Sequence, residues 1–404
     1  MGNLKVGFLL LHPFSESMAS GVRTIELAKA LSTMDVETKI FTPYEKTQIK
    51  EGVEIINVPT VFSTFGVESH FYHASRRIYY SRALQKLVIK ISKQLARGRI
   101  KVSSKLQSIL KESDLDILQA EQDNAAMMLL SARLELDIPI VLDLHGIWPE
   151  ELLAAAAITE GSGEWNELQA TTNHIVENVD LTVCLSDAMR EYVLSHYNVD
   201  SRKVAVVPPG GRIFCDEYSE RGLPWKIVYA GIVSYRKHVD LFVRSMPHVK
   251  EKMPNVEFGI TKKGDLLKQV QDMAKALGLE PNYFWFHNLE ETLRFLSSCH
   301  IGVLPTTNDE SARISMPSKL FDYLSVGLPV VANDVGGWTD IIKKNNLGRI
   351  SKDEPLDFAS CILELLSNPE ELIECGTNGI QIIKNTYNWS KSAETLFSCY
   401  KALA

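Results

Sequence analysis

Short apolar runs alternate with amphipathic stretches along most of this chain, and this alternation constrains the fold more than any other feature. Residues 5–11 and 256–260 have the length and composition of buried strands, whereas residues 21–33 and 239–249 carry apolar side chains at helical spacing. Strands that alternate with helices pack into parallel sheets covered by helices. The sequence therefore predicts an α/β protein.

The alternation runs in two series, separated by a turn-rich linker at 207–224. A chain of 404 residues is long enough for two or three domains. We predict two Rossmann-like, doubly wound domains, 1–207 and 208–386, that face each other across a cleft and bind ligands beyond the carboxyl ends of their strands. The predicted strands are 5–11, 37–41, 116–120, 139–144, 180–185, 204–207, 225–230, 256–260, 301–304 and 329–332.

Composition excludes several other classes of protein. The chain is 45% hydrophobic with a net charge of −7, which argues against nucleic acid as a partner. Its six cysteines show no C-x-x-C spacing, as expected for free thiols in a reducing compartment. No apolar run approaches the roughly 20 residues of a membrane span, and the first apolar run is too short for a signal peptide. A cytoplasmic location is therefore expected.

The segment 316–337 combines a loop, a short predicted helix, a buried strand and a glycine turn. Pro317 suits the first turn of a helix, where a missing N–H costs nothing. Ser318 and Lys319 then lie where unpaired backbone N–H groups point outward. The dipole and free donors of such a helix start favour an anion.

The same segment carries a carboxylate close to that helix start. Asp322 lies one turn after Ser318, and Gly327 is expected to end the helix before the apolar run 328–332. One short element therefore offers donors for phosphate and an acceptor for sugar hydroxyls.

The pattern P-S-K-L-F-D-Y-L-S-V-G-L-P-V-V-A at 317–332 resembles the donor-binding segment of retaining, family-4-type glycosyltransferases of the GT-B fold. The resemblance implies that Asp322, in place of the family's Glu, holds the ribose of a nucleotide sugar. A second family Glu falls at Ile314, so Glu310 is the candidate for its role. Residues 387–404 resemble the family's last helix, which crosses back to the first domain.

A second segment, 229–240, resembles the family's strand–G-R-x-x-x-x-K-G–helix segment, whose Arg and Lys grip the donor diphosphate. Lys237 matches the Lys, and Ile232 stands at the Arg position, so Arg236 is the candidate for the second charge. Fixed cations stabilise the negative charge that develops on a departing diphosphate. The alternative is that both are solvated charges at a helix start.

Two shorter features fall where the family contacts the nucleobase. Residues 261–264 occupy the place of the family's glycine loop, and His287 follows the aromatic run 283–286. A packed structural role for His287 is the alternative.

The first domain supplies the predicted acceptor side. Gly21, in the strand–loop–helix segment 12–31, resembles the glycine that lets the backbone approach donor phosphate and acceptor. His145 matches the family His that contacts the transferred sugar, with a structural histidine as the alternative. Asp143 and Glu121 also lie at predicted strand ends and are expected to face the acceptor.

Neither a metal nor a cofactor is expected. No G-x-G-x-x-G follows a strand, so a nicotinamide site has little support. Asp114 and Asp116 form a nominal D-x-D but precede a strand, and the sequence shows no metal-ligand cluster.

The segment 76–111 holds eleven Lys or Arg and no acidic residue. Apolar residues recur at three- and four-residue spacing within it, which predicts a basic amphipathic helix. Such a helix could make a peripheral contact with anionic lipid on the inner face of a membrane, or receive an anionic lipid-linked acceptor. The alternative is a helix packed on its own domain.

These features together predict a retaining glycosyltransferase that moves a sugar from a nucleoside diphosphate sugar to a hydroxyl acceptor (a glycan, a lipid-linked molecule or a small molecule). Two alternatives stay open. One is a non-hydrolysing nucleotide-sugar epimerase of the same fold. The other is a non-catalytic partner subunit, favoured by Ile232 and Ile314.

Overall fold

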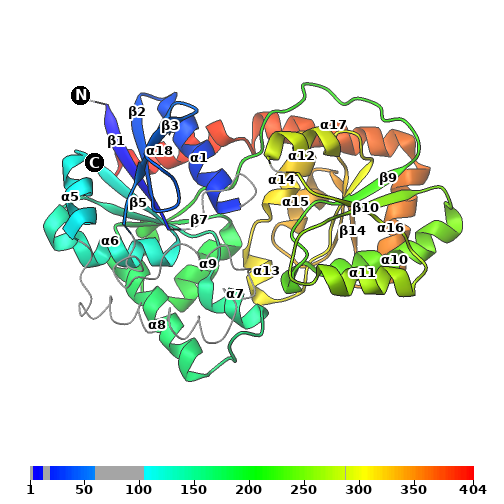
Figure 1. The fold of residues 1–404 in the computed structure, drawn as a ribbon, viewed down its shortest axis with the longest axis horizontal. Coiled ribbons are helices and arrows are strands. Elements are labelled where there is room, and N and C mark those ends of the chain that lie inside the picture. Colours follow the sequence, from blue (N-terminus) through cyan, green and yellow to red (C-terminus); the bar gives the residue numbers. More distant parts are fainter. Residues whose placement is uncertain (1–2, 12–18, 60–103, 287) are drawn as a thin grey trace. The chain divides into compact units, whose positions relative to one another are not determined.

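A computed structural model describes residues 3–11, 19–59, 104–286 and 288–404 of the chain. Unit 1 comprises Met1–Pro208 with Trp389–Ala404, and unit 2 comprises Pro209–Asn388. Each unit is a predominantly parallel sheet with helices packed on it (Figure 1), which confirms the predicted doubly wound α/β fold class.

The described sheet of unit 1 has the strand order β3-β4-β2-β1-β5-β6-β7-β8, and its neighbours are parallel except for β3 and β4. The chain winds outward from β1 and then returns to β5 on the other side of β1, so winding reverses between these strands. Loops leaving the two strands diverge at such a reversal and make room for a ligand. The strands are β1 Leu4–Leu10, β2 Val36–Thr42, β3 Gln48–Lys50, β4 Val53–Asn57, β5 Ile117–Glu121, β6 Ile140–Asp143, β7 Leu181–Cys184 and β8 Val204–Val206.

Helices pack on this sheet through a shared apolar core. Leu27 and Leu31 of α1 lie in the core with Leu396 and Tyr400 of the C-terminal helix α18, together with Val6 of β1. The last helix of the chain is therefore an integral part of unit 1. The helices of the unit are α1 Ala19–Ser32, α5 Ser104–Glu112, α6 Gln122–Leu136, α7 Trp148–Ala154, α8 Gly163–Asn178, α9 Asp187–His196, α18 Trp389–Lys401 and the 3-10 helix η2 Ser201–Lys203.

Unit 2 repeats the same construction with a six-stranded parallel sheet in the order β11-β10-β9-β12-β13-β14 among its described residues. Winding reverses here between β9 and β12. The strands are β9 Lys226–Tyr229, β10 Glu257–Thr261, β11 Asn282–Phe284, β12 Ile301–Leu304, β13 Val330–Asn333 and β14 Gly348–Ser351.

The core of unit 2 lies between this sheet and the helices on its faces. Phe242 of α10 and Phe358 of α16 are fully buried against strand residues such as Ile301. The helices are η3 Tyr235–Lys237 (3-10), α10 Val239–Lys252, α11 Leu267–Ala276, α12 Leu289–Leu296, α13 Glu310–Ile314, α14 Ser318–Ser325, α15 Thr339–Lys344, α16 Pro355–Ser367 and α17 Pro369–Asn385.

Four short strands have no counterpart among the predicted elements. β3 and β4 form a hairpin whose turn, Glu51–Gly52, has positive φ at both residues (51° and 83°). β11 and β14 have three and four residues and stand at the two edges of their sheet. Strands this short and partly polar lack the apolar run on which the prediction relied.

Gly264 brings the loop after β10 into contact with the loop after β9. Its φ is +142°, and a Cβ at this position would lie 1.9 Å from the carbonyl oxygen of Val233. The Val233 N–H donates to the Lys263 carbonyl at 2.8 Å, and the Val233 carbonyl accepts from Leu266 N–H at 3.2 Å. Glycine is therefore required for these two loops to be tied together.

We expect Gly264→Ala to lower the free energy of unfolding by about 2–4 kcal/mol, because the new methyl group must displace the Val233 backbone. Gly278→Ala is the matched control, since Gly278 has φ +67° and nothing lies within 4 Å of its added Cβ. That control should cost about 1 kcal/mol. Urea unfolding followed by circular dichroism measures both, and equal losses would contradict the close contact at Gly264.

Candidate functional site

Unit 1 places two carboxylates side by side at the carboxyl edge of its sheet. Glu121 is the last residue of β5 and Asp143 is the last residue of β6, and the two are aligned in register. Both residues are completely buried. A buried carboxylate is unfavourable as an anion unless it is paired, so neighbouring groups must supply positive charge.

Arg23 of α1 supplies the first positive charge. Its Nε donates to Asp143 Oδ2 at 2.8 Å and its Nη2 donates to Asp143 Oδ1 at 3.1 Å. Nη2 also donates to the Val207 carbonyl at 3.0 Å. Burial alone would raise the pKa of Asp143, but the charge of Arg23, together with His145, lowers it to about 2. Asp143 is therefore ionised over the whole physiological range.

His145 supplies the second positive charge. Its Nε2 lies 2.9 Å from Glu121 Oε2 and 3.6 Å from Asp143 Oδ2. Burial alone would lower the pKa of His145, but hydrogen bonding to Asp143 and Glu121 raises it to about 9. The Nδ1 atom is buried without a hydrogen-bond partner among the described residues. A protonated imidazole thus keeps one N–H for a ligand.

A buried hydrogen-bond relay connects this cluster to the C-terminal helix. Tyr400 Oη donates to Gln119 Oε1 at 2.5 Å, and Gln119 Nε2 donates to Glu121 Oε1 at 2.9 Å. Because the tyrosine occupies the amide oxygen, the amide N–H groups face the carboxylates. Gln119, Tyr400 and Arg23 were not among the residues predicted from the sequence. The single signal was a polar Gln119 inside the apolar run of β5.

Glu121, Asp143 and His145 also bring three potential metal ligands within 4.8 Å of one another. No metal-ligand cluster was expected from the sequence, and the proximity of these three side chains corrects that expectation. The two carboxylates, the Arg23 guanidinium and the His145 imidazolium together have a net charge of zero. A divalent cation would have to displace Arg23 from Asp143 and the proton from His145, so these donors favour internal pairing.

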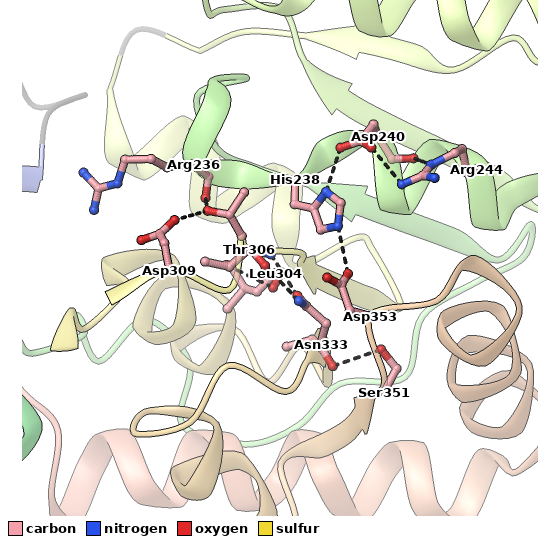
Figure 2. Close-up of polar contacts among 12 residues, drawn as sticks. Arg236, His238, Asp240, Arg244, Leu304, Thr306, Asp309, Asn333, Ser351 and Asp353 are labelled. Carbon is pink, nitrogen blue, oxygen red and sulfur yellow. Dashed lines mark hydrogen bonds and ion pairs between the residues drawn. The ribbon is translucent and has the colours of Figure 1, made fainter. Parts of the chain in front are cut away.

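In unit 2, Arg236 and Lys237 lie on η3, in the loop that leaves β9 at the winding reversal. The Arg236 carbonyl accepts from Thr307 N–H at 3.4 Å and from Thr307 Oγ1 at 3.3 Å, which joins this loop to the loop after β12. Figure 2 shows the side chain of Arg236 directed away from His238. The predicted diphosphate cations therefore lie at the carboxyl edge of the sheet.

Helix α14 carries the three other predicted donor residues of unit 2. It begins at Ser318, and Pro317 precedes it as the N-cap with φ −72° and ψ 117°, so the placement of Pro317 in the first turn was wrong by one residue. Lys319 Nζ donates to Asp322 Oδ2 at 3.0 Å, and 15% of the Asp322 side chain is exposed. The predicted phosphate and ribose ligands are thus immediate neighbours.

Helix α14 is anchored at the strand ends by Tyr323, which sequence analysis missed. Tyr323 Oη accepts from Ala230 N–H at 2.8 Å and donates to the Val303 carbonyl at 3.2 Å. A Cβ at Gly302 would lie 2.6 Å from the Tyr323 ring. The glycine inside an apolar strand was the available signal of this close approach.

Glu310 and Ile314 stand at the two ends of the short helix α13. The Glu310 side chain is 45% exposed and its Oε2 lies 3.1 Å from Arg313 Nη1. Ile314 is 3% exposed and belongs to the packed interior. Ile314, at the position of the family's Glu, therefore packs in the interior. Glu310 is exposed enough to contact a ligand.

Several predicted features lie at or beyond the edge of the described residues. Gly21 falls in the first turn of α1, which begins at Ala19, two residues before the predicted start. The preceding loop 12–18, His287 and most of the basic segment, 60–103, are outside the described residues. Within α5, Leu106 and Leu110 are buried, as expected of a helix packed on its own domain. No helix in the described part is long and apolar enough to cross a bilayer.

Comparison with known proteins gives two family matches. Residues 20–210 match the family described as Glycosyltransferase Family 4, and residues 224–368 match Glycosyl transferases group 1. A D-inositol 3-phosphate glycosyltransferase of Corynebacterium kroppenstedtii is 23% identical over 250 residues, which make up 56% of this chain and 54% of that protein. The chain thus spans about half the length of this curated relative.

Solved structures share the fold over the whole chain. Sucrose-phosphate synthase from Thermosynechococcus elongatus has a TM-score of 0.75 at 13% identity, with 99% of each chain covered. Anabaena HepE in complex with UDP and glucose has a TM-score of 0.69 at 13% identity, with 99% of this chain and 100% of that chain covered. The chain therefore carries a Glycosyltransferase Family 4 domain at residues 20–210 and a Glycosyl transferases group 1 domain at residues 224–368, and its fold is the predicted GT-B type.

Proposed function

We propose that this protein is a retaining glycosyltransferase that moves a sugar from a nucleoside diphosphate sugar to a hydroxyl group of a glycan, a lipid-linked molecule or a small molecule. One observation carries the proposal. In unit 2, Tyr323 of helix α14 contacts the strand ends from which the loop bearing Arg236 and Lys237 leaves, where winding reverses. Cationic side chains at such an edge, together with the backbone N–H groups at a helix start, favour a diphosphate.

On the donor side, Lys237, Arg236 and Lys319 hold the diphosphate, and Asp322 accepts hydrogen bonds from the ribose hydroxyls. Lys319 must give up its hydrogen bond to Asp322 in order to bind phosphate. The same exchange frees the Asp322 carboxylate to bind the ribose. Ser318 supplies a backbone N–H at the helix start, and Glu310 contacts the sugar. These groups stabilise the charge that appears on the diphosphate as the bond to the sugar breaks.

On the acceptor side, Gly21 brings backbone close to phosphate and acceptor, and the free Nδ1–H of His145 donates to an oxygen of the transferred sugar. Glu121 and Asp143 keep His145 protonated and fixed. The acceptor oxygen attacks the anomeric carbon from the face that the diphosphate leaves, and its proton passes to the leaving phosphate oxygen. No protein nucleophile is needed, and the proposal includes neither a metal nor a cofactor.

The two alternatives receive no support from the comparisons. The curated relative carries the name of a glycosyltransferase, not of an epimerase or a binding subunit. An epimerase would convert the donor without an acceptor, so mass analysis of donor alone distinguishes it. A binding subunit would show no turnover at all.

A thermal-shift panel of UDP-, GDP-, ADP- and dTDP-sugars tests the donor class. A ligand at 100 times its dissociation constant stabilises the folded state by about 2.7 kcal/mol. UDP is the first nucleotide to examine, because HepE was solved with UDP and glucose. Absence of any shift across the panel would overturn the proposal.

Lys319→Ala should lower kcat/KM for sugar transfer by about a hundredfold to a thousandfold, because one donor to developing charge is lost. Lys268→Ala is the matched control, since Lys268 also pairs with an aspartate on its own helix but is 77% exposed on α11. It should leave transfer unchanged. Equal activity of the two variants would remove Lys319 from the diphosphate site.

Transfer should fall as pH rises through about 9, because the raised pKa of His145 means that its proton is present below that value and lost above it. The same ionisation contributes stability that is complete below the ordinary value of 6.5 and disappears through about 9. His145→Asn should abolish this alkaline limb of the pH–rate profile. His248→Asn, at an exposed histidine of α10, is the control and should retain the limb.

We also propose that the protein is cytoplasmic and that its basic segment 76–111 makes a peripheral contact with the inner face of the membrane. Liposome flotation should show binding to vesicles containing anionic lipid that weakens as salt is raised, because exposed charges are screened. Neutral vesicles are the control. Equal flotation with both, or none, would rule out this contact.

A further inference from the structure

His238 ends the loop that carries Arg236 and Lys237, and its backbone conformation is unusual. It directly follows Lys237 and has φ 40° and ψ 36°, in the left-handed region. The resembled segment has glycine at this position, where that conformation costs little. A side chain there costs roughly 1–2 kcal/mol, so its contacts must compensate.

Both ring nitrogens of His238 contact carboxylates. Nδ1 lies 2.8 Å from Asp240 Oδ1, and Nε2 lies 2.8 Å from Asp353 Oδ1 (Figure 2). Asp240 is in the first turn of α10, and Asp353 lies between β14 and α16. Two carboxylates on the two nitrogens require both nitrogens to donate, which is the imidazolium form.

Among the described residues, two carboxylates face His238. Asp240 faces it from its own helix, and Asp353 faces it from the turn after the edge strand. Arg244 reaches the ring only through Asp240, whose Oδ2 accepts from Arg244 Nη2 at 2.9 Å. Hydrogen bonding to Asp240 is the main cause that raises the pKa of His238 above 6.5, with burial opposing it.

Hydrogen bonds at three positions hold the loop after β9, and one of them comes from the contact of His238 with Asp353. The Val233 N–H is tied to Lys263 and the Arg236 carbonyl to Thr307, and His238 adds the tie to Asp353. The first two ties hold the loop to its flanking loops at the reversal. The third fixes the backbone immediately after Lys237 to a distant part of the same sheet.

We infer that His238 is a positioning residue whose bridge between Asp240 and Asp353 holds Arg236 and Lys237 in the conformation that receives a nucleoside diphosphate. This inference rests on the proposed function. Diphosphate affinity then depends on the charge of His238. The bridge is complete below pH 6.5 and is lost as pH rises through the raised pKa.

Two variants separate the bridge from the backbone conformation. His238→Gly removes both hydrogen bonds while relieving the left-handed strain, so failure to fold is not expected. Asp353→Asn keeps the shape and removes one charge. Asp272→Asn is the matched control, because Asp272 is an exposed carboxylate of the same unit that pairs with Lys268 on α11.

Isothermal titration with UDP, GDP, ADP and dTDP at about pH 6 and about pH 9 gives the first readout, using whichever nucleotide the wild type binds best. Both bridge variants should bind the nucleotide about fivefold more weakly near pH 6. Without the bridge, binding must also order the loop, which costs free energy. The affinity of His238→Gly should no longer fall with pH, whereas Asp272→Asn should follow the wild type. Wild-type affinity and pH dependence in His238→Gly would overturn the inference.

Hydrogen exchange of residues 231–241 in the free protein gives a second readout that needs no ligand. His238→Gly and Asp353→Asn should both exchange faster there than Asp272→Asn. Unchanged exchange would show that His238 does not hold the loop. If the wild type bound none of the four nucleotides, the proposed function would fall, and the exchange rates would still decide the role of His238.

Discussion

The pairing of buried charges at the ends of β5 and β6 governs the chemistry available to unit 1. Glu121 and Asp143 are both fully buried, and their anions persist because Arg23 and His145 face them. Removing either cation would leave an uncompensated charge in the interior, which is far more costly than an exposed ion pair that breaks. The arrangement therefore fixes the ionisation of His145 with Nε2 against the carboxylates, and Nδ1 has no hydrogen-bond partner among the described residues.

Unit 2 uses neutral backbone contacts more than buried charge to shape its edge. Tyr323 joins the ends of β9 and β12, Gly264 lets two loops touch, and the Arg236 carbonyl is held by Thr307. Arg236 and Lys237 are half-buried in this framework. A rigid backbone with charged side chains at its rim is suited to an anionic ligand, because the positions of the charges are set before binding.

The strands that consist of continuous apolar runs were readily predicted from sequence; residues 301–304, for example, coincide with β12. The two ends of α14 were also predicted from the sequence to within one or two residues. Gly327, with φ 62°, closes the helix with hydrogen bonds from its own N–H to Leu324 and from Leu328 N–H to Tyr323. Short edge strands such as β14 were missed, because their pairing depends on a neighbour rather than on their own composition.

The sequence by itself determined the fold class, the strands that are continuous apolar runs and the position of helix α14 to within one residue, since each depends on local periodicity or on a few adjacent residues. Only the tertiary structure decided that Tyr400 bonds to Gln119, or that Asp353 bonds to His238. These partners are 281 and 115 residues apart in the chain. Their meeting follows from how the strands are ordered in space and from the need of buried polar groups for a partner, which no local pattern encodes.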